Sequence, residues 1–149
     1  MRRAVRAIIQ RDDSLLVMKR NKFGKEYYAL VGGGIDLDET PEQALVREVK
    51  EESGLDVISQ RLVYIEEAGE MYGTQYVFVC EVNGGEPALS LDSEEAKIHA
   101  LGQNLYEPMW LKRSELATTE LLPYELRDHL VADLANGFPE QPITFTATE

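Results

Sequence analysis

The 149-residue sequence predicts one domain with a layered α/β fold around a mixed β-sheet. Apolar runs of strand length fill much of the first half of the chain. A helix with clear start and stop signals interrupts these runs, and a second helix comes late. Strands before and after a helix are typical of a sheet covered by helices. With 44% hydrophobic and 28% charged residues, the chain has the composition of a globular domain.

The strands are predicted from short apolar runs bounded by turn residues. The second run ends in three glycines, and the fourth is expected to be central and buried on both faces. The runs occupy residues 15–18, 27–31, 62–65, 75–80 and 109–111.

The first helix is predicted over residues 40–53. Thr40 is its N-cap, Pro41 takes the first helical position and Gln43 completes a capping box, while Gly54 ends the helix. These signals are local, so they fix both ends of the helix without reference to the rest of the fold.

The second half of the chain carries weaker signals. A helix is expected from Pro123 to Asn136, with one apolar face formed by Leu126, Leu130, Val131 and Leu134. Residues 83–107 are expected to be a long, mostly polar loop, and a loop of that length is usually functional or mobile. Residues 138–149 are expected to form a weakly ordered tail.

Charge and cysteine content exclude several classes of function. The net charge is −12, yet the first 25 residues hold eight Lys or Arg and two Asp, so they carry +6 and the remainder carries −18. An acidic surface repels nucleic acid polymers, which bind through neutralised phosphates. A small polyphosphate bridged by a divalent cation stays compatible with this surface. The single cysteine, Cys80, excludes a disulfide framework and a cysteine zinc site.

Hydropathy gives no membrane or export signal. No apolar run is long enough to span a bilayer, and the basic residues near the N-terminus are not followed by the long apolar segment of a secretion signal. We therefore expect a cytoplasmic protein with no membrane partner.

Residues 33–55 carry the pattern with the clearest chemistry. A glycine-rich turn leads into an acidic loop at residues 36–39 and then into a helix rich in carboxylates. Glu48, Glu51 and Glu52 share one helix face, where like charges destabilise the helix. A bound cation would offset that repulsion, and clustered carboxylates suit Mg²⁺ or Mn²⁺. The alternative is a solvated acidic face, but the glycine turn and acidic loop at fixed offsets favour a metal site.

These residues together resemble the Nudix box, the signature of the MutT-like hydrolases. The pattern is Gly, five residues, Glu, seven residues, then Arg-Glu-aliphatic-any-Glu-Glu-any-Gly-aliphatic. Every fixed position is filled, by Gly33, Glu39, Arg47, Glu48, Val49, Glu51, Glu52, Gly54 and Leu55. The order of predicted elements resembles the family over roughly residues 3–135. Upstream of the box, Tyr28 and Val31 stand where the family often has Trp and Pro.

The resemblance implies the Nudix fold, an α/β/α sandwich around a mixed sheet, with a single domain at residues 1–137 and a tail at 138–149. It also implies a hydrolase in which water attacks a phosphorus of a pyrophosphate linkage, aided by Mg²⁺ or Mn²⁺. The implied metal ligands are the Gly32 carbonyl and the carboxylates of Glu48, Glu51 and Glu52, with Glu48 alternatively acting as general base.

The resemblance assigns supporting roles to two further box residues. Arg47 would orient the glutamate cluster as part of the catalytic machinery. Glu39 would anchor the acidic loop to the helix behind the metal ligands.

Further candidates lie outside the box. The family often adds a carboxylate from the loop before the last short strand, and Glu94, Glu95 and Glu107 are the candidates, although each taken singly is more typical of a surface charge. The basic N-terminal segment offers phosphate contacts, with a solvated hairpin as the equal alternative. The candidates are Arg6, Lys19, Arg20, Lys22 and Lys25, and Arg20 and Lys22 rank first because they follow a predicted strand near the glycine turn. Tyr28 and Tyr72 are candidates for substrate contact.

The expected substrate is a small nucleotide, and several alternatives stay open. Nucleoside triphosphates and dinucleoside polyphosphates rank above ADP-ribose and nucleotide sugars, because the offset of Tyr72 from the box resembles that of dinucleoside polyphosphate hydrolases. A non-catalytic nucleotide sensor is the main rival, but a sensor has no need of the full carboxylate set. Nucleic acid decapping ranks last, since no broad basic face is predicted. A homodimer would be compatible with the family.

Overall fold

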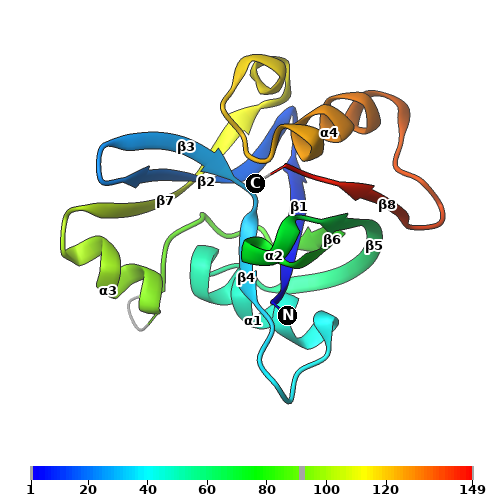
Figure 1. Ribbon diagram of the computed structural model, residues 1–149. Helices are drawn as coiled ribbons and strands as arrows, with labels where there is room; N and C mark the ends of the chain where they lie inside the picture. Colours follow the sequence, from blue (N-terminus) through cyan, green and yellow to red (C-terminus); the bar gives the residue numbers. More distant parts are fainter. Residues whose placement is uncertain (1, 91–92, 149) are drawn as a thin grey trace.

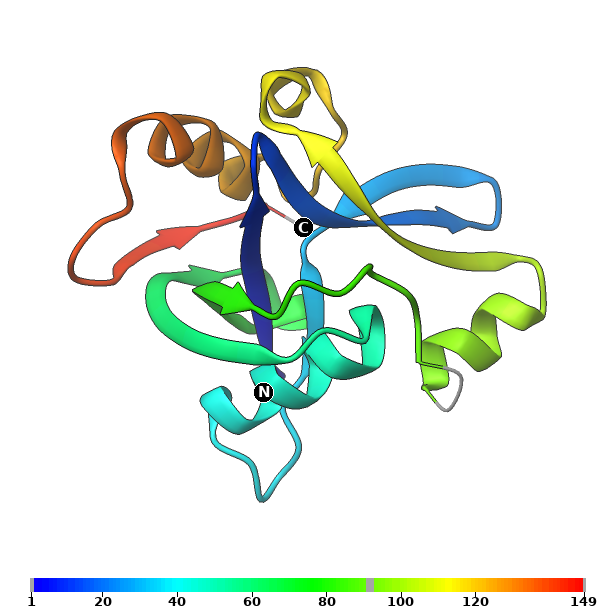
Figure 2. The ribbon, with the colours of Figure 1, turned by 180° about the vertical axis from the view of Figure 1, so that it is seen from behind.

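The computed structural model describes residues 2–90 and 93–148, apart from the side chain of Glu94 (Figure 1). Over these residues the chain forms an eight-stranded mixed sheet with helices packed on it, which confirms the predicted α/β class. Figure 2 shows the same arrangement from behind, with α1 and α4 lying at opposite ends of the central strand β1.

The elements follow one another with short connections through most of the chain. The strands are β1 (Arg3–Arg11), β2 (Ser14–Lys22), β3 (Lys25–Ala29), β4 (Val31–Gly34), β5 (Val57–Glu67), β6 (Thr74–Val82), β7 (Asn104–Lys112) and β8 (Ile143–Thr146). The helices are α1 (Pro41–Ser53), α2 (Gly69–Tyr72), α3 (Glu94–Ala100) and α4 (Tyr124–Asn136), with a 3-10 helix at Arg113–Thr118.

The strand order is β3-β2-β1-β6-β5-β8, with β4 also paired to β1 and β7 also paired to β2. The β1–β6 and β5–β8 pairs are parallel, and the other pairs are antiparallel. Strand β1 is shared: its end at Gln10 and Arg11 pairs with β2, whereas residues 4–7 pair with β4. This pairing sets Arg6 opposite Gly32, beside the start of the Nudix box.

Two buried clusters lie on opposite faces of the sheet, because side chains alternate along each strand. In β1, Ile8 belongs to the cluster that α4 covers with Leu126 and Leu130. Its neighbours Ala7 and Ile9 belong to the cluster that α1 covers. The α1 residues in that cluster are Ala44, Leu45 and Val49.

Helix α1 has the capping residues predicted at both of its ends. The Thr40 hydroxyl accepts a hydrogen bond from the Gln43 N–H, the Gln43 side chain accepts one from the Thr40 N–H, and Gly54 adopts a left-handed conformation at the C-terminus. Helix α4 is also found, but Val131, predicted on its apolar face, is 37% exposed. The face that α4 buries is therefore narrower than its sequence suggested.

Three predictions of secondary structure were wrong. The predicted strand at residues 27–31 is two strands, separated at the buried Leu30. The predicted loop at residues 83–107 contains α3 and the first part of β7. Part of the predicted tail forms β8, which pairs with β5. Both overlooked strand segments gain their stability from tertiary pairing, which short local patterns do not carry.

Candidate functional site

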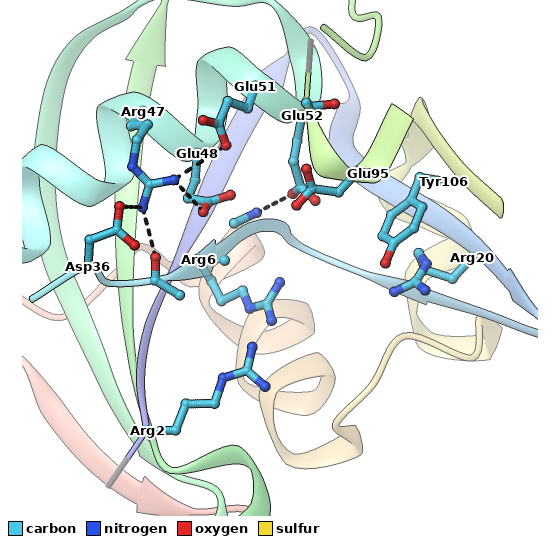
Figure 3. A pocket seen from close by; sticks show the side chains of 14 residues that line it. Arg2, Arg6, Arg20, Asp36, Arg47, Glu48, Glu51, Glu52, Glu95 and Tyr106 are labelled. Carbon is cyan, nitrogen blue, oxygen red and sulfur yellow. Dashed lines mark hydrogen bonds and ion pairs between the residues drawn. The ribbon is translucent and has the colours of Figure 1, made fainter. Parts of the chain in front are cut away.

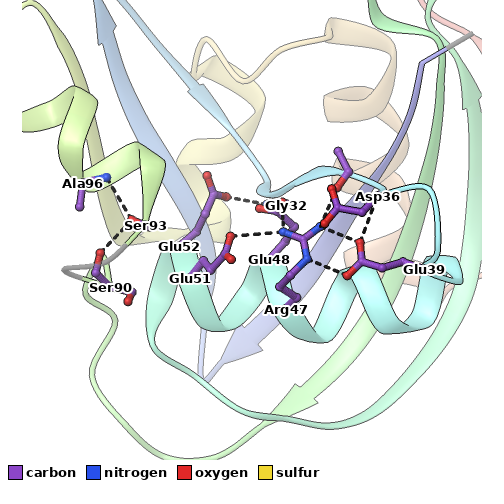
Figure 4. A network of polar contacts seen from close by, with 11 residues as sticks. Gly32, Asp36, Glu39, Arg47, Glu48, Glu51, Glu52, Ser90, Ser93 and Ala96 are labelled. Carbon is purple, nitrogen blue, oxygen red and sulfur yellow. Dashed lines mark hydrogen bonds and ion pairs between the residues drawn. The ribbon is translucent and has the colours of Figure 1, made fainter.

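Arg47 is the centre of a polar network on α1 (Figure 4). Its Nε and Nη2 atoms donate to the two carboxylate oxygens of Glu39, at 2.7 and 2.8 Å. Its Nη1 donates to Glu48 at 2.8 Å and to Glu51 at 3.3 Å, and Nη2 also donates to the Gly34 carbonyl at 2.9 Å. One guanidinium thus ties the acidic loop, the strand β4 and two box glutamates together.

This network shifts the pKa values of its members. The hydrogen bonds from Arg47 lower the pKa of Glu39 to about 2, so Glu39 stays ionised. The same contact with Glu39 raises the pKa of the Arg47 guanidinium, which stays charged. Glu39 also accepts a hydrogen bond from the Asp36 N–H at 2.9 Å, which fixes the start of the acidic loop.

Two glycines of β4 let the helix carboxylates approach the sheet. The Gly32 N–H donates to the buried Glu52 carboxylate at 2.7 Å. A Cβ atom at residue 32 would lie 1.9 Å from the Val5 carbonyl oxygen, and one at residue 33 would lie 2.4 Å from Glu48 Oε2. Both distances are far below contact, so a side chain at residue 32 would clash with the β1 backbone and one at residue 33 would displace the Glu48 carboxylate.

Burial sets the electrostatics of two box glutamates. Desolvation raises the pKa of Glu48 to about 7 and that of Glu52 to about 8, in spite of the hydrogen bonds from Arg47 and Gly32. Repulsion from Glu95 raises both values further. Buried carboxylates of this kind are unfavourable without a nearby positive charge.

These side chains and those around them line a cavity of about 540 Å³ (Figure 3). Glu95 enters from α3, whose N-cap Ser93 also borders the cavity. Arginines form the other side. The lining residues are Arg2, Arg6, Arg20, Gly32, Gly33, Gly34, Asp36, Arg47, Glu48, Glu51, Glu52, Ser93, Glu95 and Tyr106.

The donor set fits a hard divalent cation. Glu48 Oε2 and Glu95 Oε2 are buried in the structure without a hydrogen-bond partner, and both residues line the cavity. Unpaired carboxylate oxygens are the ligands that Mg²⁺ and Mn²⁺ prefer. Within residues 2–90 and 93–148, however, no three acidic, His or Cys side chains are already gathered closely enough to hold a metal. The box carboxylates are instead hydrogen-bonded to protein donors, Glu48 and Glu51 to Arg47 and Glu52 to the Gly32 N–H.

The structure brings most of the predicted site residues together. Gly32, Arg47, Glu48, Glu51 and Glu52 line the cavity, and so do Arg20 and Glu95 from the wider candidate sets. Glu39 lies behind them, on Arg47.

Other candidates lie elsewhere. Lys22 is exposed at the end of β2, and Glu107 is exposed on β7. Tyr28 packs against the core cluster under α4, and Tyr72 is 46% exposed on α2. None of these four residues lines the cavity. The side chain of Glu94 lies outside the described residues.

The sequence did not single out Arg2, Asp36, Ser93 or Tyr106 as site residues, whereas Arg6 was one of five basic residues offered as phosphate contacts and lines the cavity. Arg6 had a usable signal, because a charged residue interrupts the otherwise apolar run Ala4-Val5-Arg6-Ala7-Ile8. Tyr106 had none, since its position depends on the pairing of β7 with β2.

Comparison with known proteins gives a match to the NUDIX domain over residues 1–126. An ADP-ribose pyrophosphatase of Methanocaldococcus jannaschii is 40% identical over 103 residues, which cover 66% of this chain and 61% of that protein. The NAD-capped RNA hydrolase NudC of Escherichia coli is 30% identical over 108 residues, which cover 72% of this chain and 38% of that protein. The chain thus matches less than two thirds of the length of either relative.

Solved structures share the fold. An ADP-ribose pyrophosphatase from Streptococcus suis superposes with a TM-score of 0.65 at 24% identity, covering 97% of this chain and 98% of that one. A NUDIX hydrolase from Nitrosomonas europaea gives a TM-score of 0.71 at 16% identity, covering 99% and 78%. Across the described residues, no helix has the length and apolar character needed to cross a membrane.

Proposed function

Because the chain belongs to the NUDIX family, we propose that it is a metal-dependent pyrophosphohydrolase that cleaves the pyrophosphate linkage of a small nucleoside diphosphate derivative. One observation carries this proposal: five acidic residues and four arginines line one cavity, and two of the buried carboxylate oxygens have no hydrogen-bond partner. A purely structural acidic cluster would satisfy or expose those oxygens.

The residues that would hold the cation are Glu48, Glu51 and Glu52, with Glu95 and the Gly32 carbonyl beside them. When bound, Mg²⁺ or Mn²⁺ supplies Lewis-acid stabilisation of the charge that develops on the pyrophosphate oxygens. Arg47 holds Glu48 and Glu51 in place and is itself locked by Glu39. Glu48 acts either as a ligand or as the base that takes a proton from the attacking water, and Glu95 is the second candidate for that base.

The finer substrate assignment has three candidates, in order of rank. Nucleoside triphosphates and dinucleoside polyphosphates suit the arginine-lined side of the cavity, because their additional phosphates need positive charge. ADP-ribose is the second candidate, favoured by the name of the Methanocaldococcus jannaschii relative. A nucleic acid polymer ranks third: one relative is named as an RNA hydrolase, but the net charge of −12 opposes polymer binding.

The test is a product-release assay with Mg²⁺, with Mn²⁺ and with chelator. It would compare nucleoside triphosphates, dinucleoside polyphosphates, ADP-ribose, nucleotide sugars and NAD. We expect metal-dependent turnover of one class, with a loss of about 100-fold or more in Glu52→Gln. Glu42→Gln, an exposed change in the first turn of α1, is the matched control and should keep full activity.

Two results would contradict the proposal. Full activity of Glu52→Gln at saturating Mg²⁺ would remove Glu52 from the metal site. No turnover of any compound, together with a rise in melting temperature on adding nucleotide, would identify a sensor instead of an enzyme.

A further inference from the structure

We propose that Arg6 and Arg20, together with the exposed Arg2, form a phosphate-binding wall for a part of the substrate beyond the scissile linkage, so that the substrate carries three or more phosphates in a row. This inference rests on the proposed function and deepens it by naming the substrate class. In Figure 3 Arg2 and Arg6 lie on the opposite side of the cavity from the glutamates, and Arg20 lies beside Tyr106.

Arg6 is held by neutral acceptors. Its Nε donates to the Gln75 side-chain oxygen at 3.2 Å, and its Nη1 donates to the Leu30 carbonyl at 3.2 Å. Gln75 is buried, and its own amide donates to the Tyr72 carbonyl at 2.7 Å, which fixes the oxygen toward Arg6. The guanidinium is therefore oriented by neutral groups and has no carboxylate within ion-pair distance, although its charge acts at longer range on the buried Glu52 and Glu66.

Arg20 is also held by neutral groups. Its Nε donates to the Leu105 carbonyl at 3.2 Å, and its Nη2 donates to the side-chain oxygen of Asn104. The guanidinium lies over the Tyr106 ring, 3.7 Å from the ring centroid. Stacking and neutral hydrogen bonds hold the group in one orientation and leave its charge free for an anion.

Partial burial without an ion pair sets Arg6 and Arg20 apart from the other described arginines. Arg11, Arg47 and Arg127 each pair with a carboxylate. Among the described residues, Arg2, Arg6 and Arg20 have no carboxylate within ion-pair distance, although the chain has 27 acidic residues. Arg2 is exposed, like the unpaired Arg3, Arg61 and Arg113 outside the cavity, so its charge is solvated. Arg6 and Arg20 are partly buried, where an unpaired charge is costly unless an anion binds there.

The charge balance points to the length of the phosphate chain. The pyrophosphate linkage of ADP-ribose lies between two uncharged sugars, and a divalent cation on the glutamates suffices for that linkage. The three arginines would then face neutral groups. A triphosphate or a longer chain places additional negative charge against them, and Arg binds phosphate through paired hydrogen bonds.

The first experiment measures binding of inorganic tripolyphosphate by calorimetry in EDTA, so that no cation takes part. We expect Arg6→Gln and Arg20→Gln each to weaken binding by about tenfold or more. Asn104→Asp and Gln75→Glu leave the arginines in place but neutralise them, and should weaken binding to a similar degree. The control is Arg3→Gln, because Arg3 lies on the same strand outside the cavity, over Tyr76.

The second experiment compares kcat/KM for ATP and for ADP-ribose in Mg²⁺. The arginine variants should lose about tenfold or more with ATP and much less with ADP-ribose. Equal losses with both substrates, or unchanged tripolyphosphate binding in all four variants, would overturn the phosphate wall. If the wild type turns over nothing but binds tripolyphosphate in an arginine-dependent way, the wall stands and the proposed catalysis fails.

Discussion

Glu66 is a buried carboxyl group that the proposed chemistry does not use. It lies on β5 at 2% exposure, and its Oε1 has no hydrogen-bond partner in the structure. Desolvation raises its pKa from 4.5 to about 7, although the positive charge of Arg6 opposes the shift. The folded protein therefore binds the Glu66 proton more tightly than the unfolded chain does.

This predicts a pH-dependent stability that Glu66→Gln removes. The contribution of protonated Glu66 is complete below pH 4.5 and is lost as the pH rises through about 7. The variant is neutral throughout, so it should gain on the wild type between pH 4.5 and 8, by up to about 3 kcal/mol in the free energy of unfolding. Urea denaturation across that range checks this.

The neighbouring Glu67→Gln is the matched control, because Glu67 is exposed on the same strand. It should show the pH dependence of the wild type. If the stability of Glu66→Gln ran parallel to that of the wild type at every pH, the carboxyl of Glu66 would not have the raised pKa.

Gly32 and Gly33 of β4 give a second prediction at the scale of single residues. In Gly33→Ala the new methyl group meets the end of the Glu48 side chain, which can turn away, so the fold should survive while activity falls by about tenfold or more. In Gly32→Ala the methyl group meets the backbone of Val5, which cannot move without breaking the β1–β4 pair. Melting temperature and kcat/KM of the two variants separate the effects; a large fall in the melting temperature of Gly33→Ala would contradict the argument.

At the scale of elements, α1 shows why its part of the site was predictable. The helix cap, the box glutamates and the glycine turn lie within 24 residues, Gly32 to Leu55, and interact through local geometry. On the opposite side of the cavity, Arg6 and Arg20 were candidates only as members of a basic segment, and Tyr106 was not predicted. Arg6, Arg20 and Tyr106 come from three strands, and only the pairing of β1, β2 and β7 brings them to one cavity.

Two substitutions at the N-terminal end of α1 should separate the stability of the fold from the positioning of Arg47. Glu39→Gln removes the charge that locks Arg47, so kcat/KM should fall by about 10- to 100-fold with a small change in melting temperature. Thr40→Ala removes the helix cap and should cost about 1 kcal/mol of stability with unchanged kcat/KM. Steady-state kinetics and thermal denaturation of both variants check this; full activity of Glu39→Gln would show that Arg47 needs no anchor.

At the scale of the whole molecule, the sequence predicted the α/β class and the central position of the strand at residues 75–80, which lies within β6 between β1 and β5. It did not predict that the chain returns after α4 to extend the sheet. Strand β8 has four residues, and its stability depends on β5 and on the side chains beneath it. A pattern that short has no distinctive period of its own.

The packing of β8 against β5 and α4 should contribute to the stability of the whole fold and not to the activity of the site. Phe145 stacks on His129 of α4 at 4.4 Å between ring centroids and meets the edge of Tyr64 at 5.7 Å. Phe145→Ala should therefore lower the free energy of unfolding by about 2 kcal/mol, because the ring is only partly buried. The exposed neighbour Thr144→Ala should change it little. Neither residue lines the cavity, so kcat/KM should stay at the wild-type level, and an unchanged stability of Phe145→Ala would show that β8 does not hold α4 on the sheet.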